Sequence, residues 1–324
     1  MIVHILFHDN CFDGASSAAV FHRFYRDKIH PRADFSLQGM THEASQQFPE
    51  GLFRGDENAI VDFKYACSDR LTWWFDHHHS AFLTSEDEQH FRRDESGKKF
   101  YDPSFKSCTK LIATVTASRF GFECPMLDEL VGWADIIDGA QYPDAQKAVE
   151  IAEPAQKLAA VIETNKEPEF LHQIIGQLVE RPLQQVATQK AVLERYEQLA
   201  QRHHESIRII RENSFYDREV TFFDLTQYDL EGYNKFIPYY LYPEANYSVS
   251  LLRTPKRMKV SVGWNPWSRK VRKHNLAEIC ERYGGGGHPV VAAISLAPGA
   301  VERAHQIAQE IAAELRDEET RGRP

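Results

Sequence analysis

The sequence lacks the features of secreted, membrane-spanning and disulfide-stabilised proteins. Its five cysteines are scattered and include no CxxC pair, which excludes a disulfide framework and a structural zinc knuckle. No stretch approaches the ~18 uninterrupted apolar residues of a membrane span. The start, MIVHILFHDN, has neither the basic segment nor the cleavage site of a signal peptide. We therefore expect a soluble protein of the reducing cytoplasm, with no membrane partner.

The sequence also lacks a positive charge balance, internal repeats and low-complexity segments. The formal net charge of -9 argues against nonspecific binding along a long nucleic acid. The hydrophobic fraction of 42% and the charged fraction of 26% are ordinary for a globular protein, and 324 residues are enough for two domains.

The first third contains short apolar runs that end in polar residues. These runs are IVHILFHD (2–9), AIVDF (59–63) and LTWWFDHHH (71–79). A helix is expected over 15–25, and the alternation of strands and helices predicts a doubly wound, mainly parallel sheet. Ligands gather at the carboxyl ends of such strands. These ends carry His8, Asp62 and the sextet FDHHHS (75–80).

The remaining pattern predicts an α/β protein with three parts. The charged stretch 84–104 is expected to be a loop or a small excursion, and helices are expected over 104–120 and 127–139. Farther on, strands are expected over 219–225, 247–253, 258–264 and 290–296, and helices over 189–210, 275–284 and 301–318. We predict an N-terminal sheet domain (1–144), a helical connector (145–213) and a smaller C-terminal α/β domain (214–324).

The polar residues of the first domain have the composition of a metal site. They are His8, Asp9, Asp13, Asp62, Asp76, His77, His78 and His79. Mixed histidine and carboxylate donors suit Mn²⁺ or Mg²⁺ better than the thiolate sets of structural zinc. One carboxylate can bridge two ions, an arrangement used in phosphoryl displacement. The alternative is that each Asp caps a helix or turn and each His lies on the surface.

Five motifs together resemble those of the DHH phosphoesterase family with its DHH-associated C-terminal domain, including nanoRNase or oligoribonuclease-type members. In chain order the motifs are HDNCFDG (8–14), VDF (61–63), FDHHHS (75–80), WADIIDG (133–139) and RYGGGGH (282–288). The resemblance implies two manganese ions, with Mg²⁺ or another divalent ion as the alternative. It places His8, Asp13, Asp62 and His77 among their ligands, with Asp62 as the bridge.

The resemblance also implies roles for the neighbouring residues of these motifs. Asp76 would orient an imidazole, and His78 would lie beside the metals near the substrate phosphate. The remaining ligand would be Asp135, as in the single-strand exonucleases, or Asp138, as in the nanoRNase and pyrophosphatase members; we prefer Asp138.

The first motif departs from the family at Cys11, where an Asp ligand is usual. The first ion would then keep His8 and Asp62, supplemented by Asp9, Asn10, a Cys11 thiolate or water. One hypothesis is that this metal site is weaker or has an altered preference, with Cys11 as a ligand. The other is that Cys11 fills a small apolar space.

The C-terminal domain contains a candidate phosphate site. Glycines without a Cβ allow an anion to approach backbone N–H groups, although glycine runs are also flexible loops. The resemblance assigns the substrate phosphate to Gly284, Gly285, Gly286, Gly287 and His288. Residues 245–277 contain no acidic residue and hold Arg253 and Arg269 among several bases and aromatics, which suits a nucleotide or is a solvated basic face. Gly263 stands where nanoRNase members often have Arg, and Arg269 is the candidate replacement.

These observations predict a Mn²⁺-dependent phosphoesterase that cleaves short oligonucleotides or small nucleotides by in-line attack of water. Asp76, His78 and His288 are the expected catalytic residues, and an Arg assists them in stabilising charge. The alternatives are a catalytically impaired nucleotide or phosphate sensor and an inorganic pyrophosphatase, against which the GGGGH motif argues. The exact substrate, the cleavage polarity and the oligomeric state, a homodimer included, stay open.

Overall fold

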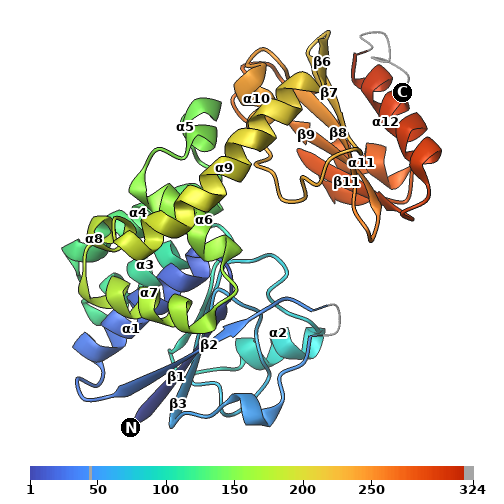
Figure 1. Ribbon diagram of the computed structural model, residues 1–324. Helices are drawn as coiled ribbons and strands as arrows, with labels where there is room; N and C mark the ends of the chain where they lie inside the picture. The colour runs from blue at the N-terminus through green and yellow to red at the C-terminus, as the bar shows by residue number, and fades with distance from the viewer. Residues whose placement is uncertain (44–45, 317–324) are drawn as a thin grey trace. The chain divides into compact units, whose positions relative to one another are not determined.

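The computed structural model describes residues 1–43 and 46–316, and the chain divides into two compact units (Figure 1). The first unit contains Met1–Tyr142 and Ala152–Glu197, and the second contains Pro143–Ile151 and the chain from Gln198 onward. The helix α9 (Lys190–Glu212) therefore begins in one unit and ends in the other. None of the described helices combines the length and apolar character needed to cross a bilayer.

The first unit is built on a parallel sheet of five strands, as the sequence predicts. The strand order is β2-β1-β3-β4-β5, and every neighbouring pair is parallel. The strands are β1 (Ile2–His8), β2 (Asp34–Met40), β3 (Glu57–Val61), β4 (Trp73–Asp76) and β5 (Lys99–Tyr101). Burial on both faces explains the near-continuous apolar runs. On β4, Trp73 faces Phe21 of the first helix, whereas Trp74 faces Tyr65 on the opposite side of the sheet.

The helices of this unit begin and end where local signals stand. They are α1 (Phe12–Lys28), α3 (Cys108–Phe120), α4 (Asp128–Asp138), α6 (Pro154–Thr164), α7 (Pro168–Glu180) and α8 (Leu183–Ala187), with 3₁₀ turns at Glu50–Leu52 and Pro125–Leu127. The Ser107 hydroxyl accepts a hydrogen bond from the Lys110 amide (3.1 Å) and caps α3. Proline occupies the first position of α6 and α7, where its missing N–H is not needed.

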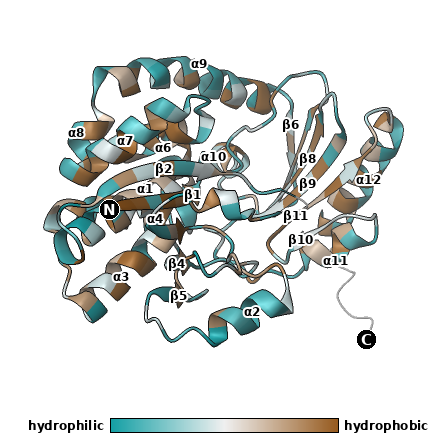
Figure 2. Ribbon diagram, turned by 90° about the horizontal axis from the view of Figure 1, so that it is seen from below, coloured by the Kyte–Doolittle hydropathy of each residue, from teal (hydrophilic) through white to brown (hydrophobic). Residues whose placement is uncertain are grey.

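The stretch 84–104, predicted to be a loop or a small excursion, is not a loop over most of its length. This stretch contains α2 (Ser85–Arg92) and β5. The Thr84 hydroxyl accepts from the Asp87 amide, and the Asp87 carboxylate accepts from the Thr84 amide, so a capping box starts the helix. The helix is largely hydrophilic (Figure 2), but Phe91 packs against Trp74 with ring centroids 5.1 Å apart. A single apolar residue such as Phe91 does not produce the repeating apolar pattern by which a helix is recognised in a sequence.

Four strands were not predicted, namely β2, β5, β6 (Ser214–Asp217) and β10 (Gly286–His288). All four lie at an edge of their sheet, where most of their side chains stay at least partly exposed. The sequence of β2, DFSLQGM, therefore has few of the apolar residues that mark a buried strand.

The second unit contains a mixed sheet of order β10-β11-β9-β8-β7-β6, in which only β7 and β8 pair in parallel. Its other strands are β7 (Val220–Leu225), β8 (Tyr247–Arg253), β9 (Met258–Trp264), β10 (Gly286–His288) and β11 (Val291–Leu296). Its helices are α5 (Ala145–Glu150), α10 (Ile237–Leu241), α11 (Leu276–Glu281) and α12 (Val301–Arg316). The predicted end of the last helix, 317–318, lies outside the described residues. Apolar residues of α11 and α12 share one core with β8, β9 and β11.

Candidate metal centre

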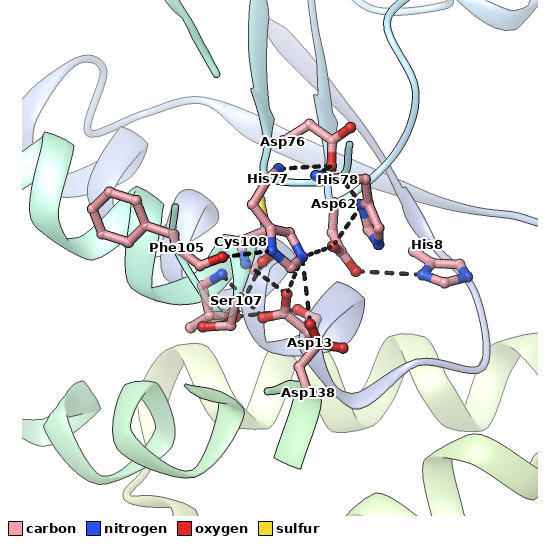
Figure 3. A network of polar contacts seen from close by, with 12 residues as sticks. His8, Asp13, Asp62, Asp76, His77, His78, Phe105, Ser107, Cys108 and Asp138 are labelled. Atoms are coloured by element: carbon pink, nitrogen blue, oxygen red, sulfur yellow. Dashed lines mark hydrogen bonds and ion pairs between the residues drawn. The ribbon is translucent and has the colours of Figure 1, made fainter. Parts of the chain in front are cut away.

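The polar residues of the first unit meet at the carboxyl edge of three adjacent strands. His8 ends β1, Asp62 follows β3, and Asp76 ends β4 directly before His77 and His78. Figure 3 shows their side chains converging with Asp13 and Asp138, which come from α1 and α4. The parallel topology thus assembles residues that are distant in sequence.

The backbone at this edge is adapted to the convergence. Asp62 has a φ of +56°, a left-handed conformation that Asp tolerates better than most residues, and its amide donates to the Phe75 carbonyl (3.0 Å). At Gly14 an added Cβ would lie 2.1 Å from the His8 carbonyl oxygen. Only glycine allows α1 to start so close to the end of β1, and this contact brings Asp13 to the edge.

Asp13 is held by the start of another helix. Its carboxylate accepts from the amides of Cys108 (2.6 Å) and Thr109 (3.0 Å), at the N-terminus of α3. The positive end of the helix dipole favours an anion there. Burial nevertheless raises the pKa of Asp13 well above its ordinary value, and the charges of Asp62 and Asp138 raise it further.

The imidazole of His77 points one nitrogen at three carboxylates. Its Nδ1 lies 3.2 Å from the Phe105 carbonyl, which only accepts, so Nδ1 carries a proton and Nε2 is the nitrogen left to bind a metal ion. Nε2 lies 3.5 Å from Asp62, 3.7 Å from Asp13 and 3.4 Å from Asp138. Burial would lower the pKa of His77, but these carboxylates outweigh it and raise the pKa to about 9. The same carboxylates would stabilise a metal cation that takes the place of the proton on Nε2.

Asp76 is hydrogen-bonded to the His78 ring and to two backbone amides. Its Oδ1 accepts from Nδ1 of His78 (2.7 Å) and from the amides of His77 (2.9 Å) and His78 (3.3 Å). Asp76 is fully buried, whereas the His78 side chain is 32% exposed and can be reached by a ligand. Burial would lower the pKa of His78, but the Asp76 hydrogen bond and the carboxylates raise it.

Several buried polar atoms of the cluster have no hydrogen-bond partner among the described residues. They are Nδ1 of His8, both carboxylate oxygens of Asp62, Oδ2 of Asp76 and Nε2 of His77. His8 and His77 lie at ion-pair distance from Asp62, 3.4 and 3.5 Å, without hydrogen-bond geometry. Burial would raise the pKa of Asp62, but the imidazoles of His77 and His8 hold it below its ordinary value. Buried polar groups normally have partners, and a cation is the partner that would satisfy these carboxylate oxygens and imidazole nitrogens together.

The donors fit divalent cations. Three sets have ligand atoms within 4.8 Å of one another: His8, Cys11 and Asp62; Asp62, His77 and His78; and Asp13, His77 and Asp138. Asp62 is shared by the first two sets and His77 by the last two. Shared donors at such distances suit two neighbouring ions with nitrogen and oxygen ligands.

The structure separates the two candidate aspartates of α4. Asp138 lies against His77, and burial together with the charge of Asp62 raises the pKa of Asp138 to about 6. Asp135 instead accepts a hydrogen bond from the Ser107 hydroxyl (3.2 Å) and belongs to none of the three donor sets.

Neither family models nor curated protein sequences match this chain. Solved structures do. The pGpG-specific phosphodiesterase PggH from Vibrio cholerae aligns with a TM-score of 0.70 and 18% identity, covering 97% of this chain and 99% of that chain. A DHH domain from a member of the s1p family of ribosomal proteins aligns with a TM-score of 0.57 and 11% identity, covering 97% and 87%.

RecJ from Thermus thermophilus, solved in complex with Mn²⁺, aligns with a TM-score of 0.54 and 13% identity, covering 97% of this chain and 52% of RecJ. The chain has the fold of the DHH phosphoesterases. The expected fold class is thereby confirmed.

Within this DHH fold, Cys11 lies in a polar setting. It directly precedes α1, and its sulfur belongs to the donor set with His8 and Asp62. Burial raises the pKa of the Cys11 thiol well above its ordinary value, and the charges of Asp62 and Asp13 raise it further. These surroundings differ from the apolar space that one of the two hypotheses required.

His42 is a residue of this edge that the sequence did not point out. Its ring stacks on Phe63, with centroids 4.4 Å apart and an interplanar angle of 9°, and lies 4.6 Å from the His8 ring. His42 is exposed, whereas Phe63 is fully buried. It follows the end of β2, and because β2 was not predicted, its end was not counted among the strand ends. His79, by contrast, is exposed and joins no donor set.

The glycine run of the second unit forms a tight hairpin. Gly286–His288 pairs with β11, and His288 is exposed. An added Cβ would lie 2.4 Å from the Ala293 carbonyl oxygen at Gly285 and 2.5 Å from the Val291 carbonyl oxygen at Gly287. Gly284 has a φ of +77°. Close packing thus explains Gly285 and Gly287, while Gly286 has open space around it.

The two candidate arginines do not lie together. Arg253 ends β8 opposite Met258, whereas Arg269 follows β9, whose last residue pairs with Tyr247 at the other end of β8. The Trp264 amide donates to the Val290 carbonyl (2.9 Å), so the loop that carries Arg269 starts beside the glycine hairpin. Arg253 is separated from that end by the length of the strand.

Gly263 has a steric reason to lack a side chain. A Cβ there would lie 2.8 Å from the Tyr239 hydroxyl and 3.1 Å from the Ser248 hydroxyl, which hydrogen-bond to each other (2.9 Å). This buried pair occupies the space beside β9, so no arginine fits at this position without displacing it.

Proposed function

We propose that the chain is a divalent-metal-dependent phosphoesterase that hydrolyses short oligonucleotides or small nucleotides, with Mn²⁺ as its ion. The observation that carries this proposal is the buried Asp62 carboxylate, which has no hydrogen-bond partner among the described residues and belongs to two donor sets. The fold likeness to PggH, a pGpG-specific phosphodiesterase, and to RecJ in complex with Mn²⁺ supports the choice of substrate class and ion.

The proposed ligands form two groups around Asp62. One ion would be held by His8, Cys11 and Asp62, and the other by Asp13, His77 and Asp138 with the help of Asp62. Ions at such a site act as Lewis acids that make a water nucleophilic and offset charge on the phosphoryl group. The Phe105 carbonyl fixes the tautomer of His77, as partners of metal-binding histidines commonly do.

His78 has the geometry of a donor to the substrate. Because Asp76 holds its Nδ1, Nε2 is left to face a ligand from a partly exposed ring. We assign it a hydrogen bond to a phosphoryl oxygen, where charge develops in the transition state. Asp76 acts through His78 and is a positioning residue.

In the second unit, Gly286, His288 and Arg269 are the proposed contacts to a substrate phosphate. The hairpin leaves the Cα of Gly286 open to an anion, and His288 is exposed beside it. The register of β8 and β9 argues against Arg253 as a contact to the same phosphate.

The test is hydrolysis of pGpG and pApA with Mn²⁺ or Mg²⁺, followed by chromatography of the products, with pyrophosphate as a further substrate. We expect mononucleotide release that falls to background in Asp62→Asn and His77→Ala. Asp138→Asn should lose activity while Asp135→Asn keeps it, since these variants make the same change three residues apart on α4. Dinucleotide binding without cleavage by any loaded form would refute the enzyme and favour the sensor.

A further inference from the structure

The donor sets of the metal centre differ in chemistry. His8, Cys11 and Asp62 offer nitrogen, sulfur and oxygen, whereas Asp13, His77 and Asp138 offer nitrogen and oxygen only. Cys11 is the sole sulfur donor in the sets formed by the described residues. The other nearby cysteine, Cys108, directs its thiol to the Phe75 carbonyl (3.3 Å).

The backbone of Cys11 is fixed relative to the other donors. The Cys11 carbonyl accepts from the Ala15 amide (3.0 Å) in the first turn of α1. Gly14 holds that turn against the carbonyl of His8, as described above. The packing of α1 on β1 therefore places the Cys11 backbone where its sulfur lies within 4.8 Å of donor atoms of His8 and Asp62.

A second observation points from this cysteine to a bound ion. Asp62 is 1% exposed, and neither of its carboxylate oxygens has a hydrogen-bond partner among the described residues. Nδ1 of His8, at 3.4 Å from this carboxylate, also has none. The Cys11 thiol thus lies with two donors, Asp62 and Nδ1 of His8, that have no hydrogen-bond partner among the described residues.

Ligand softness decides which ion suits each set. Thiolate favours Zn²⁺ and other borderline ions, whereas carboxylate and water suit Mg²⁺ and Mn²⁺. We propose that Cys11 binds as a thiolate and gives the His8 side of the centre a stronger preference for Zn²⁺ or Co²⁺ over Mn²⁺ than the Asp13 side has. The thiol proton leaves to solvent when the ion binds. This inference rests on the proposed function only in placing ions at the centre.

Cobalt absorption tests the sulfur bond directly. Titration of the metal-free protein with Co²⁺ should give a thiolate-to-cobalt charge-transfer band in the near ultraviolet. The band should be absent in Cys11→Ser and Cys11→Asp but present in Cys67→Ser, which alters an exposed cysteine outside the centre. Circular dichroism verifies that each variant is folded. Co²⁺ binding without this band in the wild type, or with the band kept in Cys11→Ser, would overturn the inference.

Metal competition tests the selectivity. Protein loaded with Zn²⁺ is dialysed against excess Mn²⁺, and bound metal is measured by mass spectrometry. The wild type should retain one zinc, and Cys11→Asp should lower the zinc-over-manganese preference of this site by about tenfold or more, the lower end of effects seen when metal shells are altered. Equal retention in both would count against Cys11.

The two proposals fail separately. Cleavage of pGpG without a thiolate band leaves the phosphoesterase standing and removes the role of Cys11. A thiolate band without cleavage of any substrate removes the phosphoesterase and leaves the role of Cys11 standing.

Discussion

Replacing Asp76 by Asn should weaken the positioning of the His78 ring while leaving the other donors of the metal centre unchanged. The amide has the size of the carboxylate, and its oxygen can still accept from the two backbone amides that Oδ1 serves. It carries no charge, so the 2.7 Å bond from Nδ1 of His78 becomes a neutral one. The NH₂ group takes the place of Oδ2, which has no partner among the described residues, and stays unsatisfied.

The expected loss follows from that change. Hydrogen bonds to charged groups contribute about 1.5–3 kcal/mol and neutral ones about 0.5–1.5 kcal/mol, so the His78 ring loses roughly 1–1.5 kcal/mol of restraint. A free-energy difference of about 1.4 kcal/mol is a factor of ten. We therefore expect kcat for pGpG to fall about tenfold, which is the lower end of the range seen for outer partners of metal sites. KM should change little.

A double-mutant cycle with His78→Ala is the decisive assay. If Asp76 acts through His78, Asp76→Asn should add almost nothing to the loss already caused by His78→Ala. His79→Ala, at an exposed neighbour, is the control that should keep wild-type kcat. The reasoning is refuted if the two losses multiply, or if Asp76→Asn alone keeps kcat within twofold.

Three further outcomes are expected. Mn²⁺ at 100 times its Kd should stabilise the folded protein by about 2.7 kcal/mol, which scanning fluorimetry would register as a rise of several degrees in Tm. Asp62→Asn should abolish this rise, and an equal rise in the variant would contradict the proposed metal site. His42→Phe keeps a ring on Phe63 but loses the ring nitrogens, so KM for pGpG should rise about tenfold, and an unchanged KM would limit His42 to packing. Burial, with the charge of Arg26, lowers the pKa of His22 to about 4, so stability should fall between pH 6.5 and 4, by about 2 kcal/mol at pH 5. Urea unfolding of His22→Phe should lack this part of the loss.

The strand ends of the centre could be predicted because each buried run stops at a polar residue. His8, Asp62 and Asp76 follow apolar segments long enough to be recognised, and parallel topology brings such ends to one edge. His42 could not be predicted, since its place depends on β2, an edge strand whose sequence has little apolar content. The low apolar content of β2 therefore explains why both the strand and His42 were missed.

Spacing alone left Asp135 and Asp138 open because residues three apart share a helical face. The contact that separates them is tertiary, since the cap residue of α3, Ser107, takes Asp135 into a hydrogen bond. The glycine hairpin shows the same limit. The sequence suggested a phosphate cradle, whereas the backbone contacts of Gly285 and Gly287 appear only once β10 lies against β11.

The edge of the sheet that carries the donor sets concentrates features that oppose folding unless they have a bound partner, and this favours a functional role for them. Asp62 holds a left-handed conformation, which costs on the order of 1–3 kcal/mol for a residue other than glycine. Its carboxylate is buried without hydrogen bonds from the described residues, and Asp13 is buried close by with a raised pKa. A structural role would be met better by apolar residues, since a buried polar group without a partner destabilises a fold. A divalent cation would turn the same atoms into satisfied ligands, so on the proposed function we expect the arrangement to stabilise the protein only when the ion is bound.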